Sequence, residues 1–311
     1  MGLTRHGLAR QATPSAGWSF TDDKGVTVAL DAAPERLAID LNAAALWDFG
    51  VRPAAVFGWD ANETGDFGNA GGNIDPEGIA IAGNTAEPVQ LEKLVAADPD
   101  LIITLTFTDE DDDQYWSIAP EIVGQVREIA PIVALSATGN ANTNIGRHAQ
   151  LAAALGADPD APEVTEARER YEAAVSGLET TAREKADLSV LFINVQSDTA
   201  YVANPEPWAD LGYYLAAGVN IVNLDIDDTE SWLEISPEQA LEYASDIFMA
   251  ATIAGTLSID EIVAHPTFGQ HPAVKAGQIA GWNQSFMQSY QGGADAFEHL
   301  ATTLREATKV T

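Results

Sequence analysis

Residues 91–103 carry the sequence LEKLVAADPDLII, and residues 237–249 carry PEQALEYASDIFM. The offset between the two stretches is 237 − 91 = 146 residues at every position. Each copy predicts a helix that begins with a glutamate, a turn that ends in an aspartate, and an apolar strand. A helix followed by a buried strand is typical of parallel crossover units. The repeat therefore predicts two α/β halves that share one architecture.

Outward from the repeat, apolar strands and helices alternate along both halves. In the first half, strands are expected at 36–39, 54–57, 101–105 and 132–135, and helices at 41–49, 89–97, 119–128 and 144–155. In the second half, strands are expected at 188–195, 221–222, 247–251 and 278–282, and helices at 208–217, 238–243, 259–263 and 294–307. A hairpin over 18–30 precedes both halves. This alternation predicts an α/β fold of two three-layer lobes with mostly parallel sheets.

One long helix is expected over 160–186, where the alternation stops. Pro162 suits a first helical turn, and apolar side chains follow at steps of three and four residues: Val164, Ala167, Tyr171, Ala174, Leu178 and Ala182. A helix of about 22 residues spans roughly 33 Å and makes a stiff connector between two lobes. The chain is therefore divided into a flexible lead (1–17), an N-terminal α/β lobe (18–159), a connecting helix (160–187) and a C-terminal α/β lobe (188–311).

The composition excludes several classes of protein. The 311 residues include 15 Lys+Arg and 47 Asp+Glu, and the resulting net charge of −32 repels nucleic acids and anionic lipids. The lack of cysteine excludes disulfides, thiolate metal sites and a cysteine nucleophile. A hydrophobic content of 46% excludes a disordered chain, and no apolar run reaches the roughly 18 residues of a membrane span. The five histidines are dispersed, so no metal site on the protein is expected.

Further segments complete an ordered pattern: PERLAID at 34–40 precedes the first copy of the repeat, and HPAVKAGQI at 271–279 follows the second. Together with the repeat and the central helix, they resemble the substrate-binding proteins of iron-siderophore and cobalamin ABC importers. These are periplasmic binding proteins with a helical connector between the lobes, and the resemblance extends from Ala33 to Ala307. It implies a ligand cleft between two lobes, capture of a ferric siderophore without catalysis or a cofactor, and delivery to an ABC permease with its ATPase.

The resemblance also implies a location. Proteins of this kind act as monomers outside the cytoplasm, in the periplasm or on the outer face of a bacterial membrane. A lipid anchor is expected on a cysteine upstream of this chain, in a longer precursor, because the chain itself has none. Nucleic acid is not an expected partner, given the net charge.

Glu92 and Glu238 begin the two copies of the repeated helix. An acidic side chain at a helix start interacts favourably with the helix dipole, so a purely structural role is one interpretation. The resemblance provides another, because in this family one glutamate on the tip of each lobe pairs with arginines of the permease. Glu92 and Glu238 are the matching positions and are therefore candidate docking residues.

Aromatic side chains follow many of the expected strands, and ligands of open α/β sheets bind at the carboxyl ends of strands. Their flat apolar faces suit a bulky chelate. Arg147, at the start of a helix, is the basic residue best placed to reach a ligand oxygen. The alternatives are packing under loops for each aromatic residue and a surface ion pair for Arg147. The candidate ligand-binding residues are Trp59, Tyr115, Trp116, Arg147, Tyr201, Trp208, Trp232, Trp282 and Phe286.

The scarcity of basic residues near the expected strand ends indicates the kind of ligand. Ferric catecholates are multiply anionic and call for several Lys or Arg, whereas a neutral or cationic ferric siderophore of the hydroxamate type does not. The same fold also leaves cobalamin or haem open as the ligand, with Tyr115 as a candidate haem ligand.

A carboxylate-based hydrolase is the alternative from another functional class, although no GxSxG, Walker A or strand-borne GxGxxG motif occurs. The acidic run at 109–113 is expected to be a solvated loop, with contact to Ca²⁺ or a cationic ligand group as the alternative.

Overall fold

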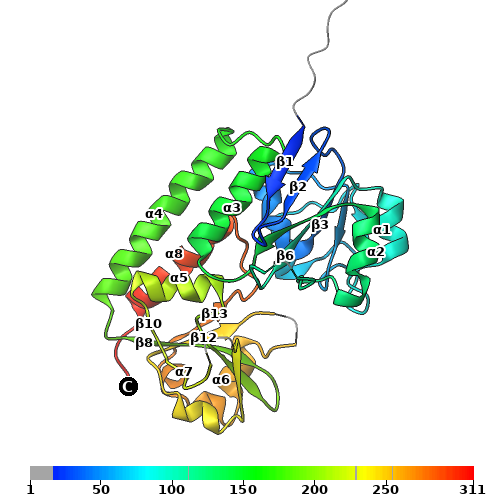
Figure 1. Ribbon diagram of the computed structural model, residues 1–311. Coiled ribbons are helices and arrows are strands. Elements are labelled where there is room, and N and C mark those ends of the chain that lie inside the picture. The colour runs from blue at the N-terminus through cyan, green and yellow to red at the C-terminus, as the bar shows by residue number, and fades with distance from the viewer. Residues whose placement is uncertain (1–16, 111, 228–229, 254) are drawn as a thin grey trace, which may run out of the picture.

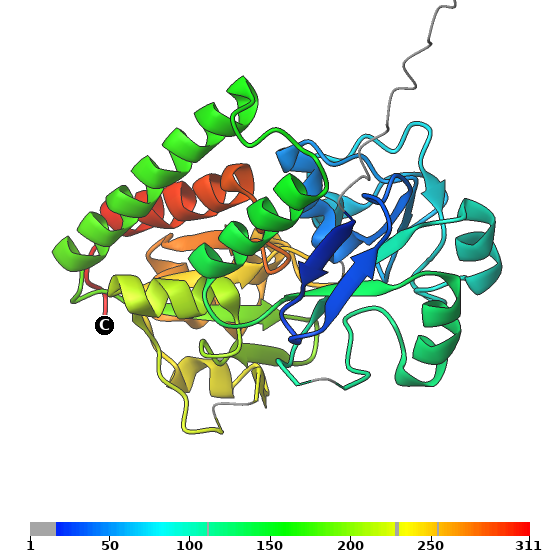
Figure 2. The same cartoon turned by 45° about the horizontal axis from the view of Figure 1, so that its top comes forward.

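The computed structural model describes residues 17–110, 112–227, 230–253 and 255–311, and Figure 1 shows its two lobes. The lead predicted at 1–17 lies outside the described residues except for Gly17. Each lobe is built on one sheet with helices on both of its faces, and the long helix α4 (Pro162–Glu184) extends along both lobes (Figure 1 and Figure 2). The predicted α/β fold of two lobes joined by one long helix is therefore confirmed.

The N-terminal lobe contains a fully parallel, five-stranded sheet in the order β5-β4-β3-β6-β7. Its strands are β3 (Leu37–Asp40), β4 (Ala55–Phe57), β5 (Ala80–Ile81), β6 (Leu101–Thr106) and β7 (Ile132–Ser136). The predicted hairpin is present as β1 (Trp18–Thr21) and β2 (Thr27–Leu30). Its turn docks on β7, where the Asp23 amide donates to the Ala134 carbonyl at 3.0 Å.

Helices cover both faces of this sheet. On one face lie η1 (Leu41–Phe49) and α3 (Ala141–Ala154), and on the other lie α1 (Leu91–Ala97) and α2 (Val123–Ile129). The short helices η2 (Gly68–Gly71) and η3 (Pro120–Ile122) complete the lobe. The helix predicted at 41–49 forms as a 3₁₀ helix that ends at Gly50, whose φ of 94° favours glycine.

The C-terminal lobe contains a six-stranded sheet with the order β11-β9-β8-β12-β13, and β10 also pairs with β8. Its strands are β8 (Ser189–Val195), β9 (Ala200–Ala203), β10 (Asn220–Ile221), β11 (Trp232–Ile235), β12 (Ile247–Ala251) and β13 (Ile279–Trp282). The strands β8, β10, β12 and β13 are parallel, whereas β9 and β11 pair antiparallel at one edge. The sequence predicts the four parallel strands and misses the antiparallel pair.

Helices again lie on both faces of the second sheet. One face carries α5 (Ala209–Ala217) and α8 (Tyr290–Glu306). The opposite face carries η4 (Gln239–Glu242), α6 (Ile259–Ala264), η5 (Phe268–Gln270) and α7 (Pro272–Lys275). The helix predicted at 238–243 is thus a single 3₁₀ turn, shorter than its repeat partner α1. We call the face with α1 and α2 in one lobe, and the face with η4 and α6 in the other, the outer faces.

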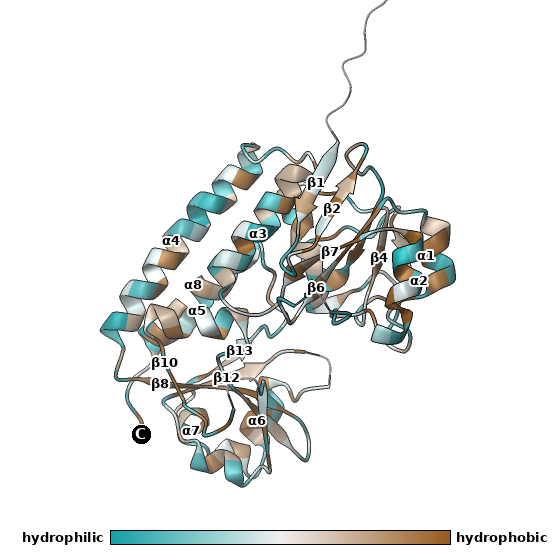
Figure 3. Cartoon of the chain, viewed as in Figure 1, coloured by the Kyte–Doolittle hydropathy of each residue, from teal (hydrophilic) through white to brown (hydrophobic). Residues whose placement is uncertain are grey.

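A continuous apolar core joins the two lobes. The connector α4 (Pro162–Glu184) begins at Pro162 as predicted, and its buried stripe packs mainly on α8, with further contacts to α5 and α3. The rings of Tyr171 and Phe297 lie 5.6 Å apart, and Tyr213 of α5 stacks on Phe297 at 4.7 Å. Figure 3 shows the hydrophilic colours of α4 alternating with hydrophobic ones along its length. Because this core would break if the lobes separated widely, we expect only small closing motions.

The repeat is also present in the hydrogen bonds. Asp100, just before β6, accepts the amides of Glu35 and Arg36 at 2.7 and 2.9 Å. Asp246, at the matching position before β12, accepts the Ser189 amide at 2.8 Å. In each lobe, therefore, the aspartate that ends the repeated turn fixes the start of the neighbouring strand. Burial alone would raise the pKa of Asp246, but the hydrogen bonds that it accepts bring the pKa below the ordinary value.

Candidate ligand pocket between the two lobes

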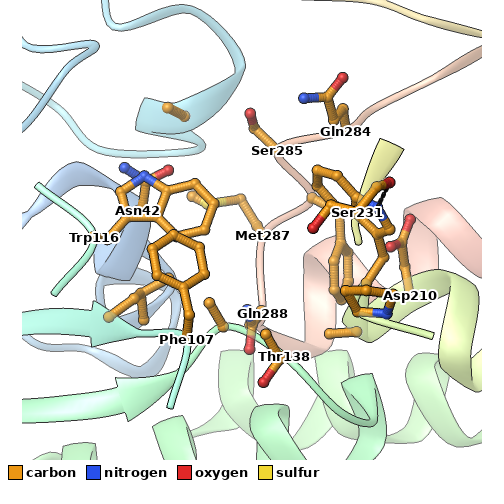
Figure 4. Close-up of a pocket in the computed structure, with 17 residues that line it drawn as sticks. Asn42, Phe107, Trp116, Thr138, Asp210, Ser231, Gln284, Ser285, Met287 and Gln288 are labelled. Atoms are coloured by element: carbon orange, nitrogen blue, oxygen red, sulfur yellow. Dashed lines mark hydrogen bonds between the residues drawn. The ribbon is translucent and has the colours of Figure 1, made fainter. Parts of the chain in front are cut away.

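A pocket lies between the lobes, at the carboxyl ends of strands from both sheets. We call Asn42, Phe107 and Trp116 its N-terminal wall, Trp208, Asp210 and Ser231 its C-terminal wall, and residues 284–288 its closing segment. Figure 4 shows Phe107 and Trp116 across the space from Asp210 and Ser231, with Met287 between them. The space measures about 770 Å³, part of it open to solvent. Its enclosed part is about 110 Å³, below the range of about 300–1,000 Å³ that is typical of small-molecule pockets, so a bulky ligand would occupy the open part as well.

The N-terminal wall is a pair of stacked aromatic rings. Phe107 directly follows β6, and Trp116 is held to the same strand by its amide, which donates to the Leu105 carbonyl at 2.9 Å. Their ring centroids are 4.6 Å apart at an interplanar angle of 27°. Phe107 remains 49% exposed, so a large apolar face is available to a ligand. Trp59 lies beside this wall and donates from its indole nitrogen to the Trp116 carbonyl at 3.2 Å.

Asn42 supplies the polar group of the N-terminal wall, and a buried carboxylate positions it. Asp40 ends β3 and accepts both the amide and the side-chain nitrogen of Asn42, at 3.1 and 3.2 Å. Its second oxygen accepts the Thr104 hydroxyl at 2.7 Å. Burial raises the pKa of Asp40 above the ordinary value. The N-terminal wall thus combines two aromatic rings with one amide fixed from behind.

Three tryptophans support the C-terminal wall. Trp208 lines the pocket, and its ring lies 4.9 Å from that of Trp232 and 5.7 Å from that of Trp282, edge to face in both cases. Trp232 and Trp282 lie behind Trp208 and are 6.0 Å apart. Tyr201 packs on the far side of Trp232 at 6.4 Å. Rigid aromatic layers of this kind hold an exposed ring in place at little entropic cost.

Asp210 is the one carboxylate among the described pocket residues. It is almost completely buried in the first turn of α5 and accepts the indole N–H of Trp282 at 2.7 Å. Burial raises its pKa to about 6, although the hydrogen bond from Trp282 opposes this. None of the described residues that line the pocket is Lys, Arg or His. The pocket is therefore mostly neutral at pH 7 and carries one acidic group.

The closing segment links the two lobes at the back of the pocket. Phe286 and Met287 line the pocket and also a second space, which is more open and larger, at about 520 Å³ against about 110 Å³. Just beyond it, the Ser289 hydroxyl donates to Asp48 of the N-terminal lobe at 2.5 Å. Gln288 is buried, and its side-chain oxygen has no hydrogen-bond partner within the described parts of the chain. Since buried polar groups are normally paired, this oxygen is available to a ligand N–H donor.

The predicted ligand-binding residues fall into three groups. Trp116, Trp208 and Phe286 line the pocket. Tyr201, Trp232 and Trp282 form the layer behind Trp208, and Trp59 lies beside Trp116. The structure does not bring Tyr115 and Arg147 to the pocket.

Arg147 belongs to a different contact. Its guanidinium bonds Asp23 at 2.6 Å and the Thr21 carbonyl at 2.8 Å, and it lies over the Phe20 ring at 4.9 Å. It therefore fastens the β1–β2 hairpin to α3. Because its guanidinium is bound to Asp23 and Thr21, Arg147 does not line the pocket, and the alternative of an ion pair describes it instead.

Tyr115 and the acidic run are likewise part of the N-terminal lobe's own structure. Tyr115 accepts a hydrogen bond from Arg127 at 3.0 Å, and the fully buried Lys24 lies 5.3 Å from its ring. Lys24 pairs with Asp112 at 2.5 Å, and Arg127 pairs with Asp113 at 2.8 Å. These two acids of the run are thus ion-paired and not merely solvated.

Sequence reasoning missed several pocket residues: Asn42, Phe107, Asp210, Ser231 and Met287. A signal existed for Phe107, since it is the first residue after the strand that ends at Thr106. Nothing distinguished Asp210 from the other acids of the chain. Its role depends on Trp282, which lies 72 positions away in the sequence.

Glu92 and Glu238 do not line the pocket and lie on the two outer faces. Glu92 is exposed in the first turn of α1, and Glu238 is exposed at the start of η4. Within the described parts of the chain, neither carboxylate has a hydrogen bond or an ion pair. Their positions leave both carboxylates available to another molecule.

The described residues hold neither a cluster of potential metal ligands nor a helix suited to a membrane. No group of three or more His, Asp and Glu among them is arranged to hold a metal ion. None of the helices that the structure describes is long and apolar enough to cross a membrane.

Comparison with known proteins gives matches to one kind of protein. Residues 70–285 match the model of a family described as periplasmic binding protein. DesE, a ferric-siderophore receptor protein from Streptomyces coelicolor, is 31% identical, with a TM-score of 0.87 over 94% of this chain and 100% of that chain. A search of curated proteins finds no significant match.

Two structures from Bacillus subtilis share the fold at lower identity. The petrobactin-binding protein YclQ is 15% identical, with a TM-score of 0.70 over 94% of this chain and 100% of that chain. The triscatecholate siderophore binding protein FeuA, solved with ferri-bacillibactin, is 15% identical, with a TM-score of 0.66 over 93% of this chain and 94% of that chain.

Proposed function

The chain belongs to the periplasmic binding protein family, and from this premise we propose that it captures a ferric siderophore between its lobes for import by an ABC transporter. The observation that carries the proposal is the pocket at the strand ends, with aromatic walls contributed by both lobes. The similarity to DesE, which covers all of that siderophore receptor, supports the same ligand class. In this role the protein binds and releases its cargo without chemical change, and iron arrives already held by the chelator.

The charge of the pocket narrows the class of siderophore. A multiply anionic catecholate would lose its hydration on entering a pocket that contains the acidic Asp210. No described basic residue of the pocket would compensate the negative charge of the catecholate. A neutral or cationic trihydroxamate avoids this cost. Its amide N–H groups match the free oxygen of Gln288, and a protonated amine tail matches Asp210 and the aromatic rings. We therefore propose a ferric hydroxamate as the cargo.

The remaining parts of the proposal concern delivery. We propose that the loaded monomer docks through Glu92 and Glu238 on a two-subunit permease, outside the cytoplasm, and that a lipid anchor holds the full-length precursor at the membrane. The proposed lobe boundaries are 18–159 and 188–311, with the connector at 160–187. The continuous core through α4 and α8 supports a mechanism with slight closure, in which the partner senses the ligand from a small change in the spacing of the lobes.

A titration with a panel of chelates tests the cargo. Ferrioxamine-type trihydroxamates should quench the tryptophan fluorescence with submicromolar affinity, because Trp116 and Trp208 contact the ligand. A ferric triscatecholate, cobalamin and haemin should bind at least about a hundredfold more weakly. If cobalamin or haemin bound more tightly than the trihydroxamates, that compound would be assigned as the ligand in place of a siderophore. Turnover of any chelate during the titration would contradict a pure binding function.

The raised pKa of Asp210 predicts a pH dependence that differs between ligands. A linear ferrioxamine with a protonated amine should lose up to about tenfold in affinity between pH 7.5 and 5, as Asp210 becomes protonated around pH 6. A cyclic, neutral ferrioxamine should show little change. Calorimetry at several pH values measures both ligands. The Asp210→Asn variant, which keeps an oxygen for the Trp282 indole, should remove the difference between them.

The same pKa fixes the sign of the effect on stability. Since the folded-state pKa of Asp210 is above the ordinary value, the folded protein binds the proton more readily than the unfolded chain. The contribution of Asp210 to stability is therefore lost as the pH rises from about 4 to 6. Asp210→Asn should raise the melting temperature at pH 7.5 and leave it nearly unchanged at pH 4. An equal shift at both pH values would contradict the buried, ionised carboxylate.

A further inference from the structure

Few large apolar side chains are exposed in the described parts of this protein: Trp59, Val95, Phe107, Leu241, Val263 and Val310. Phe107 and Trp59 belong to the pocket and its edge. Of the others, Val95 is 58% exposed on α1 and Leu241 is 37% exposed on η4. These two lie on the two outer faces, one in each lobe.

Val95 and Leu241 occupy the same position of the internal repeat. Their separation is 241 − 95 = 146 residues, the same offset that relates Glu92 to Glu238. The preceding residues, Leu94 and Ala240, are also separated by 146 and are fully buried in both lobes. The two helices therefore turn matching sides toward their sheets and matching sides toward solvent.

Each exposed apolar side chain lies next to a docking glutamate. In the α-helix α1, residues three apart are neighbours on the surface, which places Val95 beside Glu92. In the 3₁₀ turn η4, residues three apart lie directly above each other, which places Leu241 beside Glu238. We call Glu92 with Val95, and Glu238 with Leu241, the paired patches.

The charges around the paired patches are not compensated within the described structure. Lys93, the basic residue next to Glu92, already pairs with Glu63 at 3.1 Å. On η4, Glu242 adds another exposed acid near Glu238. Each patch thus offers a free carboxylate and an exposed aliphatic side chain together. Such a combination fits a surface that presents a cation beside an apolar recess.

We propose that Val95 and Leu241 are equivalent apolar anchors of a duplicated docking surface, and that its partner is a membrane permease with two copies of one surface. This inference rests on the proposed function and extends its docking step. A partner with two-fold symmetry offers the same cation and recess twice, and the repeat supplies two matching patches to fill them. A lipid surface fits less well, because the net charge of −32 repels anionic headgroups.

The test replaces the apolar anchors without changing charge, and glutamine is at least as good a helix former as valine or leucine. We expect the double variant Val95→Gln/Leu241→Gln to bind the permease–ATPase complex in nanodiscs at least about tenfold more weakly, with similar contributions from the two single changes. The matched control is Val263→Gln, because Val263 is 51% exposed on α6 of an outer face but has no exposed apolar repeat partner. This control should stay within about twofold of the unchanged protein.

Chelate binding and melting temperature are measured for every variant, so that a folding defect is recognised. Full-strength docking by the double variant, together with lost docking by Glu92→Lys/Glu238→Lys, would overturn the apolar anchors and leave the proposed function intact. Equal losses for the double variant and Val263→Gln would also overturn them. Binding to empty nanodiscs that disappears in the double variant would assign the anchors to lipid instead. Failure of the unchanged protein to bind any ferric chelate would overturn the proposed function itself.

Discussion

Replacing Trp116 and Trp208 together with alanine should abolish siderophore capture while the protein stays folded. The two rings line opposite walls of the pocket, so each substitution removes one apolar face that would contact the ligand. Truncating a large aromatic contact costs about 2 kcal/mol, which corresponds to roughly 30-fold in affinity. The two rings belong to different lobes and, among the described residues, do not contact each other as rings, so the two losses should add to about a thousandfold. Calorimetry with a ferrioxamine-type chelate measures the effect.

Trp47→Ala provides the matched control for this pair. Trp47 is half-buried on η1 and stacks with Arg52, whose guanidinium lies 3.8 Å from its ring, but it does not line the pocket. The control removes the same side chain and should change affinity by less than about twofold. An unchanged affinity in the Trp116/Trp208 variant would show that the chelate binds elsewhere. The more open space behind the closing segment, lined by Phe286 and Trp282, would then be the next site to test.

Much of the fold follows from local signals in the sequence. The apolar steps from Val164 to Ala182 predict the connector, and Pro162 marks its start because proline fits a first helical turn. Gly50 and Gly218 mark helix ends, where the structure has positive φ values of 94° and 96°. Such features depend on a few neighbouring residues. The antiparallel strands β9 and β11 were missed because each has only four residues, and β11 pairs with β9 across 29 to 35 positions of the chain.

The candidate site was predictable only in outline. The strand ends pointed to Trp116, Trp208 and Phe286, and the structure places these three residues at the pocket, because the carboxyl ends of parallel strands meet at one edge of a sheet. Which aromatic ring faces the ligand depends on packing between distant segments, as in the layer of Trp232 and Trp282 behind Trp208. The ion-pair partner of a charged residue likewise depends on distant parts of the chain, as for Arg147 and Asp23, which are 124 positions apart.

The internal repeat links the fold to the proposed docking on a permease. Its two copies place Glu92 and Glu238 at the start of equivalent helices, and the hydrogen bonds of Asp100 and Asp246 hold the following strands in equivalent ways. The continuous core then fixes the spacing between the two outer faces within narrow limits. A partner that binds both glutamates at once gains avidity only if this spacing matches its own. The stiffness of the connector is therefore a condition for two-point docking.

Reversing both charges, in Glu92→Lys/Glu238→Lys, should abolish transport without affecting capture. The two side chains are exposed and have no partner within the described chain, so the change should leave stability and chelate affinity within about twofold. On the permease, each attraction to an arginine would become a repulsion, and two such reversals should weaken docking by at least about a hundredfold. Uptake of a radiolabelled ferric chelate and stimulation of the permease ATPase measure the effect.

Net charge alone could also slow docking, and a second charge reversal separates this effect from the specific contact. Glu172→Lys/Glu306→Lys changes the net charge from −32 to −32 + 4 = −28, the same as the docking variant, but acts on the exposed sides of α4 and α8. It should retain transport. Replacing the facing arginines of the permease with glutamate should restore docking of Glu92→Lys/Glu238→Lys and abolish that of the unchanged protein. Unchanged transport in the docking variant would assign Glu92 and Glu238 to helix-start stabilisation, because the described parts of the chain offer their carboxylates no other interaction than that with the helix dipole.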